Sequence, residues 1–294
     1  MTQKQFLTDS FTYGMEIEWG DVPRSFEIPD NLGTWEHSEQ DIVNLNEPYQ
    51  YVCADPLGIE PPFGGEINTK PSRTWEEQVN RYFEIEKLFS DIGYPPTVSA
   101  TCHTHIHCYV PELKDDINAL KRLTKYIKEN QHTTIENVYG FYESNQMKGA
   151  PGSKMYLKFD GGRAIPEYMT DNILNLATDF GSFIKMHCAG KDGVSMGRPF
   201  RYAINMYSLK HIGTVEFRLF RGTLDPDELS SCFRFVRDFL DAALNDGPSV
   251  HELITENNYK FPPMIWDLNQ MIGWKKTKYS EGRGKKVRNY VEVI

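Results

Sequence analysis

The sequence lacks any hydrophobic run long enough to span a bilayer, and no signal-peptide pattern follows Met1. Cysteine is scarce, with 5 in 294 residues, and only Cys102 and Cys108 lie close together. Their spacing is not that of a zinc knuckle, so we expect reduced thiols. A basic excess is also missing, because the formal net charge is −9, which argues against general affinity for nucleic acids. These absences predict a cytoplasmic protein without a membrane segment.

The composition is that of an ordinary globular protein, with 39% hydrophobic and 25% charged residues. No internal repeat and no linker interrupts the chain, so we expect a single α+β domain over residues 1–294. Hydrophobic spacing and capping residues predict helices over 74–93, 112–130, 167–186 and 225–247. Residues 20–65 are rich in Pro, Gly, Asp and Asn, which indicates loops with one short strand near 49–53.

Three histidines occupy alternate positions of the stretch TCHTHIHCYV, residues 101–110. The stretch is rich in strand-forming residues, and successive side chains of a strand point to opposite faces. We therefore expect His103, His105 and His107 to share one face, with Cys102, Thr104, Ile106 and Cys108 on the other. A row of imidazoles suits metal binding, phosphate binding or simple exposure to water.

Three other short stretches have the same design, with one apolar face and one face of specific polar groups. Those groups are Glu16 and Glu18 in GMEIEW, Glu66 with Asn68 in GGEINT, and Glu216 with Arg218 in GTVEFRLF. An antiparallel sheet that simply faces water would carry Lys, Thr, Gln and Ser on its outer face. Any one of these strands fits that simpler explanation, whereas the four together favour a functional site.

The residue types on these four faces indicate the chemistry of such a site. Neighbouring strands lie about 4.8 Å apart, so Glu and His side chains of adjacent strands reach a common ion. Crowded carboxylates raise one another's pKa, and we expect cations to keep them ionised. Oxygen ligands with one or two imidazoles suit Mg²⁺ or Mn²⁺ better than Zn²⁺. Several divalent ions and an arginine are the groups that neutralise a phosphoryl group during transfer.

The ordered set GMEIEW, GGEINTKP, HTHIH, RYAINM and TVEFRLFRGTLD resembles the amidoligase family, over residues 14–225. That family belongs to the glutamine synthetase and glutamate–cysteine ligase superfamily of carboxylate–amine ligases. The resemblance implies a curved antiparallel sheet, a glutamine synthetase-like half-barrel with helices on its convex face. It further implies ATP and two or more Mg²⁺ or Mn²⁺ ions on the concave face. The implied reaction forms an acyl phosphate that an amine attacks.

The resemblance also assigns roles to individual residues. It implies that Glu18 and Glu66 hold the ion nearest the acceptor carboxylate, and that Glu16, His105 and Glu216 hold the ion bridging the nucleotide phosphates. It gives His107 a contact with phosphate or substrate, and it gives Arg218 the stabilisation of the γ-phosphoryl group. His103 receives no role.

Further nucleotide contacts are less sharply marked in the sequence. Arg198, Arg201 and Asn205 are the candidates, since arginine binds phosphate or a substrate carboxylate with two parallel hydrogen bonds. A surface role for the two arginines fits the sequence equally well. The acidic residue that would deprotonate the amine has no clear counterpart, and Asp55 is the candidate for it.

The segment 275–288, KKTKYSEGRGKKVR, carries seven basic residues and one acidic residue. Such a run predicts a solvated tail, with a lid over ATP or a contact to a polyanionic acceptor as functional alternatives. The acid and the amine are not specified by the sequence. Ammonia from a partner glutamine amidotransferase and a modified nucleic-acid base as acceptor both remain open.

Two other functions compete with the ligase. His105, His107 and Glu112 match the central part of a cupin metal motif, which would indicate a metal-dependent oxygenase or a binding barrel. The glycines that flank the cupin motif are absent, since Ser99 and Ala119 stand in their places. The third possibility is a non-catalytic relative of the ligases that binds a nucleotide.

Overall fold

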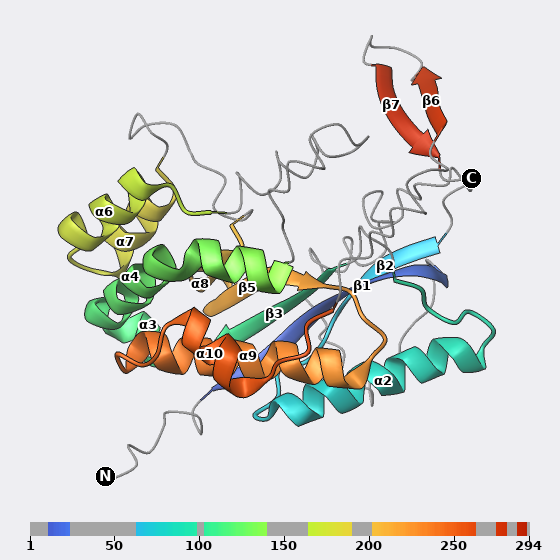
Figure 1. The fold of residues 1–294 in the computed structure, drawn as a ribbon, viewed down its shortest axis with the longest axis horizontal. Coiled ribbons are helices and arrows are strands. Elements are labelled where there is room, and N and C mark those ends of the chain that lie inside the picture. The colour runs from blue at the N-terminus through green and yellow to red at the C-terminus, as the bar shows by residue number, and fades with distance from the viewer. Residues whose placement is uncertain are drawn as a thin grey trace.

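The computed structural model of the chain describes residues 11–23, 63–98, 103–139, 164–189, 202–262, 275–280 and 287–292. These residues form a five-stranded antiparallel sheet, a set of helices and a separate two-stranded hairpin (Figure 1). The α+β class and the antiparallel sheet that the sequence predicts are confirmed. Of the described helices, none combines the length and the apolar character needed to cross a membrane.

The strands of the sheet lie in the order β2-β1-β3-β5-β4, and every neighbouring pair is antiparallel. Their bounds are Thr12–Pro23 for β1, Phe63–Asn68 for β2, His103–Tyr109 for β3, Ile204–Asn205 for β4 and Thr214–Arg221 for β5. The four stretches with one polar face are therefore β1, β2, β3 and β5. They are consecutive in the sheet, which brings their polar faces together.

The opposite face of the sheet is apolar and forms the core. Tyr13, Met15, Ile17 and Trp19 alternate along β1 with polar positions, and each is at most 2% exposed. Three helices cover this face: α2 (Trp75–Asp91), α4 (Ile117–Thr134) and α9 (Pro226–Leu244) (Figure 1). α2 contacts β1, α9 contacts β3, and α9 lies against both other helices. Burial of this apolar layer leaves the other face of the sheet for polar groups.

Two of the predicted helices are broken by an aspartate. The helix expected over 112–130 is α3 (Glu112–Asp115) followed by α4, because the extended backbone of Asp116 starts a new helix and its carboxylate accepts a hydrogen bond from Asn118 N. The helix expected over 167–186 is α6 (Glu167–Leu176) followed by α7 (Phe180–His187), which Asp179 caps. An aspartate at such a position satisfies backbone N–H groups that would otherwise lack a partner.

Short elements complete the described fold. Their bounds are Ile135–Tyr139 for the π-helix η3, Ser208–His211 for α8, Val250–Asn257 for α10, Lys275–Ser280 for β6 and Val287–Glu292 for β7. β6 and β7 pair as an antiparallel hairpin that stands apart from the main sheet (Figure 1). The basic segment 275–288 therefore contains a paired strand and the start of a second, where the sequence predicts a solvated tail.

A bulge interrupts β5 opposite the middle of β3. Between the pairs Ile106–Phe217 and Thr104–Phe220, β5 advances by three residues while β3 advances by two. The extra residue reverses the alternation beyond it. Phe220 is therefore buried in the core, and Arg221 is paired with the first residue of β3.

The side chain of Gln78 joins α2 to the first two strands. It is fully buried, and its Nε2 donates to the carbonyl oxygens of Tyr13 and Lys70, each at 2.8 Å. Its Oε1 accepts from the hydroxyl of Thr69 at 2.6 Å, and that hydroxyl accepts from Met15 N at 2.9 Å. These bonds hold the chain that follows β2 against β1, beyond the point where the pairing of the two strands ends.

Candidate functional site

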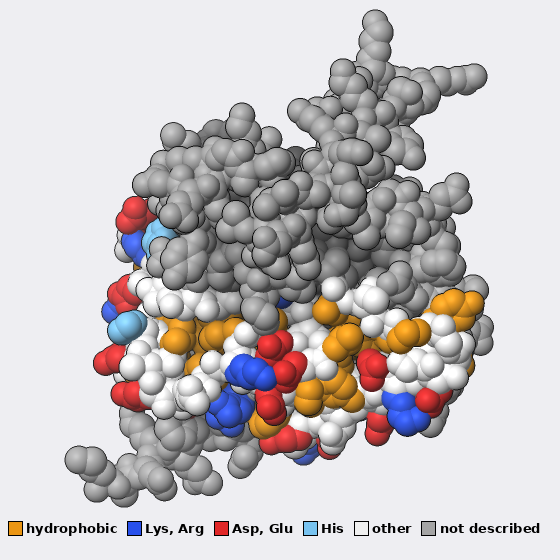
Figure 2. All heavy atoms as spheres, turned by 45° about the vertical axis from the view of Figure 1, so that its right-hand side comes forward, with side chains coloured by type: hydrophobic (Ala, Val, Ile, Leu, Met, Phe, Trp, Pro, Cys, Tyr) orange, Lys and Arg blue, Asp and Glu red, His pale blue; other side chains and the backbone are white. Residues whose placement is uncertain are grey.

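The polar face of β1, β3 and β5 gathers seven charged or ionisable side chains that we call the polar cluster. Its members are Glu16, Glu18, His103, His105, His107, Glu216 and Arg218. His105, His107 and Glu216 are less than 9% exposed. On the outer surface, by contrast, acidic and basic side chains lie beside one another with hydrophobic ones between them (Figure 2). Ionisable groups buried together in this way indicate a site rather than a solvated face.

Glu16 lies at the centre of the polar cluster. Its Oε2 is 2.7 Å from Nδ1 of His105, and its Oε1 is 2.9 Å from Nε2 of His107. The register explains this geometry, because Glu16 is paired with His105 across β1 and β3, and His107 follows on the same face. Each oxygen of the carboxylate thus has an imidazole partner. The expected repulsion among carboxylates is offset within the protein itself.

Glu216 is held from two sides. The guanidinium of Arg218 donates to its Oε1, and Nδ2 of Asn205 donates to its Oε2 at 2.6 Å. The amide oxygen of Asn205 accepts a hydrogen bond from Tyr207 N at 2.9 Å. Asn205, which the sequence places among nucleotide contacts, is buried and bonded within the protein at both ends of its amide.

Glu18 forms a second part of the polar cluster. Its Oε2 accepts a hydrogen bond from His103 N at 2.8 Å and lies 3.3 Å from Nδ1 of the same residue. His105 stands between the two parts, since its Nε2 is 3.9 Å from Oε1 of Glu18 while its Nδ1 faces Glu16. The register of β1 and β2 pairs Glu66 with Glu18. His103, which had no role in the sequence analysis, is a partner of Glu18.

Arg221 is a polar-face residue that the sequence analysis missed. It is 1% exposed and is paired with His103 across β3 and β5. Strict alternation along β5 assigns it to the apolar face, and only the bulge moves it to the polar one. No local pattern in the sequence marks that bulge.

The charges of the polar cluster stabilise one another. Burial alone would raise the pKa of Glu16, but the imidazoles of His107 and His105 outweigh it and hold that pKa well below its usual range. The pKa of Glu18 is lowered as well, because contacts with His103 and His105 outweigh its burial. Burial would lower the pKa of His107, yet the carboxylates of Glu16 and Glu216 raise it. These shifts favour the ionised carboxylates of Glu16 and Glu18 and the protonated form of the His107 imidazole.

Part of the polar cluster has the geometry of a cation site. One carboxylate oxygen from each of Glu16 and Glu216 and one nitrogen of His107 lie within 4.8 Å of one another. Ligands at about 2.1 Å from an octahedral Mg²⁺ are about 3.0 Å apart when adjacent and about 4.2 Å apart when opposite. Small side-chain movements would therefore close this set around an ion. His105, which the resemblance assigns to that ion, has Nδ1 at 3.7 Å from Oε1 of Glu216.

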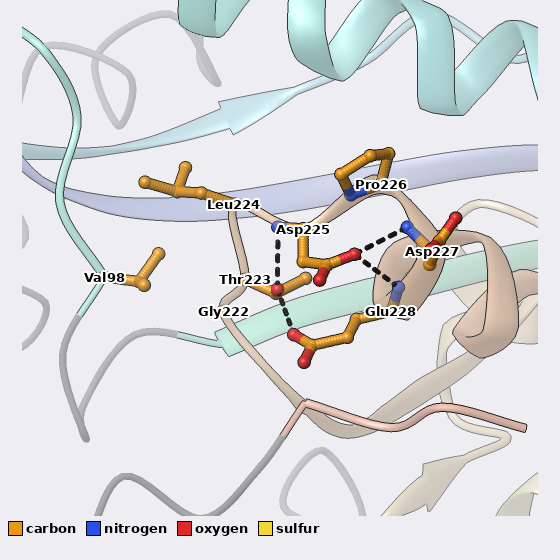
Figure 3. A pocket seen from close by; sticks show the side chains of 8 residues that line it. All are labelled: Val98, Gly222, Thr223, Leu224, Asp225, Pro226, Asp227 and Glu228. Carbon is orange, nitrogen blue, oxygen red and sulfur yellow. Dashed lines mark hydrogen bonds between the residues drawn. The ribbon is translucent and has the colours of Figure 1, made fainter.

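A surface hollow of about 650 Å³ lies where β5 leads into α9, lined by Val98 and residues 222–228 (Figure 3). Several of its polar groups are already bonded to one another, to the helix or to Lys260. The Thr223 hydroxyl donates to the carboxylate of Glu228, and Asp225 accepts hydrogen bonds from the first N–H groups of α9. The polar cluster is the better candidate for a chemical site.

Several of the predicted site residues lie outside the part of the chain that the structure describes. They are Arg198, Arg201 and Asp55, together with the predicted strand at 49–53. For Glu66 the structure gives the backbone pairing with Glu18. Their assigned roles stay predictions.

Comparison of the chain with protein-family models, with curated proteins and with solved structures gives no match. The likeness to amidoligases therefore rests on the quoted motifs alone. Function has to be inferred from those residues and from the geometry of the polar cluster.

Proposed function

We propose that the protein is an ATP- and Mg²⁺-dependent ligase that joins a carboxylate to an amine through an acyl phosphate. In the first step the substrate carboxylate takes the γ-phosphoryl group of ATP, and ADP leaves. In the second step the amine nitrogen attacks the acyl carbon, phosphate leaves, and the nitrogen loses a proton to give an amide. Ammonia from a partner glutamine amidotransferase is one amine source that fits this reaction.

The observation that carries the proposal is the polar cluster itself. Its glutamates, imidazoles and guanidinium are drawn from β1, β3 and β5 and are bonded to one another on one sheet face. Carboxylate oxygens with an imidazole are a suitable ligand set for Mg²⁺ or Mn²⁺. A guanidinium beside such a set suits the charge that develops on a phosphoryl group during transfer.

The finer description of the fold belongs to the same proposal. A glutamine synthetase-like half-barrel would have an antiparallel sheet with its site on the concave face and its helices on the convex face. The described sheet is antiparallel, and α2, α4 and α9 cover the face opposite the polar cluster. This division of the two faces supports the proposed fold.

Each part of the polar cluster has a role in the proposed reaction. Glu16 and Glu216, with an imidazole of β3, would hold one Mg²⁺, and Glu18, with Glu66 opposite it in register, would hold a second. Bound Mg²⁺ would neutralise the phosphate oxygens of ATP. Arg218 would direct its guanidinium at the γ-phosphoryl oxygens. Its side chain is 28% exposed while its partner Glu216 is 5% exposed, so the arginine lies on the accessible side of that pair.

The geometry favours the ligase over the cupin alternative. A cupin site would need Glu112 beside the histidines of β3, whereas Glu112 begins α3 after the strand has ended. A cupin also has a closed barrel, whereas the described strands form an open sheet with β2 and β4 at its two edges. A non-catalytic nucleotide-binding relative would use the same residues, and turnover separates it from the ligase.

The test is ADP formation with Mg²⁺ over a panel of carboxylates and amines. We expect ADP to form only when a suitable carboxylate is present, and an ¹⁸O-labelled carboxylate to leave one ¹⁸O atom in the released phosphate. Glu16→Gln should lower the rate on the order of 10²-fold or more. Glu84→Gln, at an exposed position of α2, is the matched control and should keep the wild-type rate.

Three results would contradict the ligase. ADP formation that ignores the carboxylate would indicate a different reaction. Phosphate without the label would exclude an acyl phosphate. Nucleotide binding without turnover across the panel would favour the non-catalytic relative.

A further inference from the structure

Thr214, the first residue of β5, touches the ring of His107 on the side away from Glu16. Its Oγ1 lies 3.0 Å from Nδ1 of His107, while Nε2 of that ring lies 2.9 Å from Oε1 of Glu16. Both ring nitrogens of this buried histidine therefore have one partner each. Rotation of the ring would break both contacts, so the pair of partners fixes its orientation.

A hydroxyl suits the Nδ1 position because its oxygen accepts hydrogen bonds. In a ring with a hydrogen on each nitrogen, the hydrogen of Nε2 points at Glu16 and the Thr214 hydroxyl accepts the hydrogen of Nδ1. When Nε2 binds a cation it carries no hydrogen, so the hydrogen of a neutral ring lies on Nδ1 and the hydroxyl accepts it. The ring keeps one place and the same hydrogen-bond partner at Nδ1 in both states.

We propose that Thr214 is a positioning residue that makes Nε2 of His107 the imidazole ligand of the cation held by Glu16 and Glu216. The inference rests on the proposed function, and it changes one assignment, since the resemblance gives the imidazole ligand to His105. Partners of this kind on a ligating histidine typically contribute 10–100-fold in metal affinity.

The chain contains a matched control for Thr214. Thr12 of β1 and Thr214 of β5 are both paired with Tyr109, one on each side of β3. Both therefore lie diagonally across from His107, yet the hydrogen bond to its ring comes from Thr214. Replacing either threonine with valine removes a hydroxyl at nearly constant volume.

The experiment is a Mn²⁺ titration of the purified full chain, followed by the electron paramagnetic resonance of free Mn²⁺. Thr214→Val should raise the Kd for Mn²⁺ about 10–100-fold. Thr214→Ser, which restores the hydroxyl, should return the Kd to within about threefold of wild type. Thr12→Val should leave it unchanged. Thermal unfolding of each variant separates lost affinity from lost structure.

The outcomes distinguish this inference from the proposed function. A wild-type protein that binds no Mn²⁺ would overturn both. Wild-type binding with an unchanged Kd in Thr214→Val would overturn the role of Thr214 and leave the ligase standing. The ¹⁵N spectrum of His107 in the wild-type protein with Mg²⁺ needs no variant. A hydrogen on Nδ1 alone would support the assignment, and a hydrogen on Nε2, with or without one on Nδ1, would overturn it.

Discussion

The imidazole of His187 makes the fold sensitive to acid. His187 ends α7 with no exposed surface, and its ring stacks on Phe183 at 5.9 Å between centroids and meets Tyr202 edge-on at 5.5 Å. Neither ring nitrogen has a hydrogen-bond partner within the described part of the chain. Burial without a partner disfavours the charged ring and lowers its pKa from 6.5 to about 4.

The sign of the effect follows from where the proton binds. Between the two pKa values the unfolded chain binds a proton at His187 that the folded chain does not, so stability falls as the pH falls through this range. At about pH 8 proton binding at His187 lowers the free energy of unfolding by almost nothing. The loss of stability reaches about 2 kcal/mol near pH 5 and about 3 kcal/mol near pH 4, because the pKa of His187 differs by about 2.5 units between the unfolded and the folded chain.

The assay compares His187→Phe with the wild-type protein by urea unfolding between about pH 8 and pH 5. Phenylalanine keeps a flat ring against Phe183 and cannot take up a proton. We expect the free energy of unfolding of the variant to exceed that of the wild type by about 2 kcal/mol more at pH 5 than at pH 8. His251→Gln, at an exposed position of α10, should change by much less. Parallel pH curves for the wild type and His187→Phe would refute the reasoning.

Two further predictions concern the polar cluster and the core. Arg218→Lys keeps a positive charge beside Glu216 but loses the planar guanidinium, so kcat should fall on the order of 10³-fold while KM for ATP changes little. Single-turnover phosphoryl transfer and the Tm check this, and a stable variant with wild-type turnover would contradict the proposed mechanism. Gln78→Leu removes the buried amide that donates to the carbonyl oxygens of Tyr13 and Lys70 and accepts from the hydroxyl of Thr69, so the free energy of unfolding should drop by about 2–4 kcal/mol. Urea unfolding measures it, and a loss under about 1 kcal/mol would show that the network is dispensable.

The strands of the main sheet were predictable because their signal is local. Alternation puts Glu16 and Glu18 on one face of β1 and His105 and His107 on one face of β3, and the observed contacts between these residues follow once the strands are neighbours. The helices were predictable for the same reason, since the apolar stripe repeats with the helical period. The apolar stripe continues across the breaks between α3 and α4 and between α6 and α7, however. The capping bond of Asp116 ends one helix and begins the next at a point that hydrophobic spacing does not mark.

The missed features depend on partners that are distant in the sequence. Gln78 lies in the buried stripe of α2 beside Val79, and an amide at such a position signals a buried hydrogen-bond network without naming its acceptors. Thr214 shares its strand face with Glu216, which marks it as a neighbour of the site. Only the pairing of β5 with β3 reveals that its hydroxyl meets His107.

The bulge in β5 decides which faces of the sheet Phe220 and Arg221 occupy. If the same residues paired regularly, without the bulge, strict alternation would exchange the faces of Phe220 and Arg221. The phenyl ring of Phe220 would leave its contacts with Phe235 and Phe261 for the polar face, and the guanidinium of Arg221 would enter the aromatic core. The faces of Phe220 and Arg221 therefore depend on the bulge itself, and a deletion of Leu219 would remove the bulge while leaving both residues on their present faces.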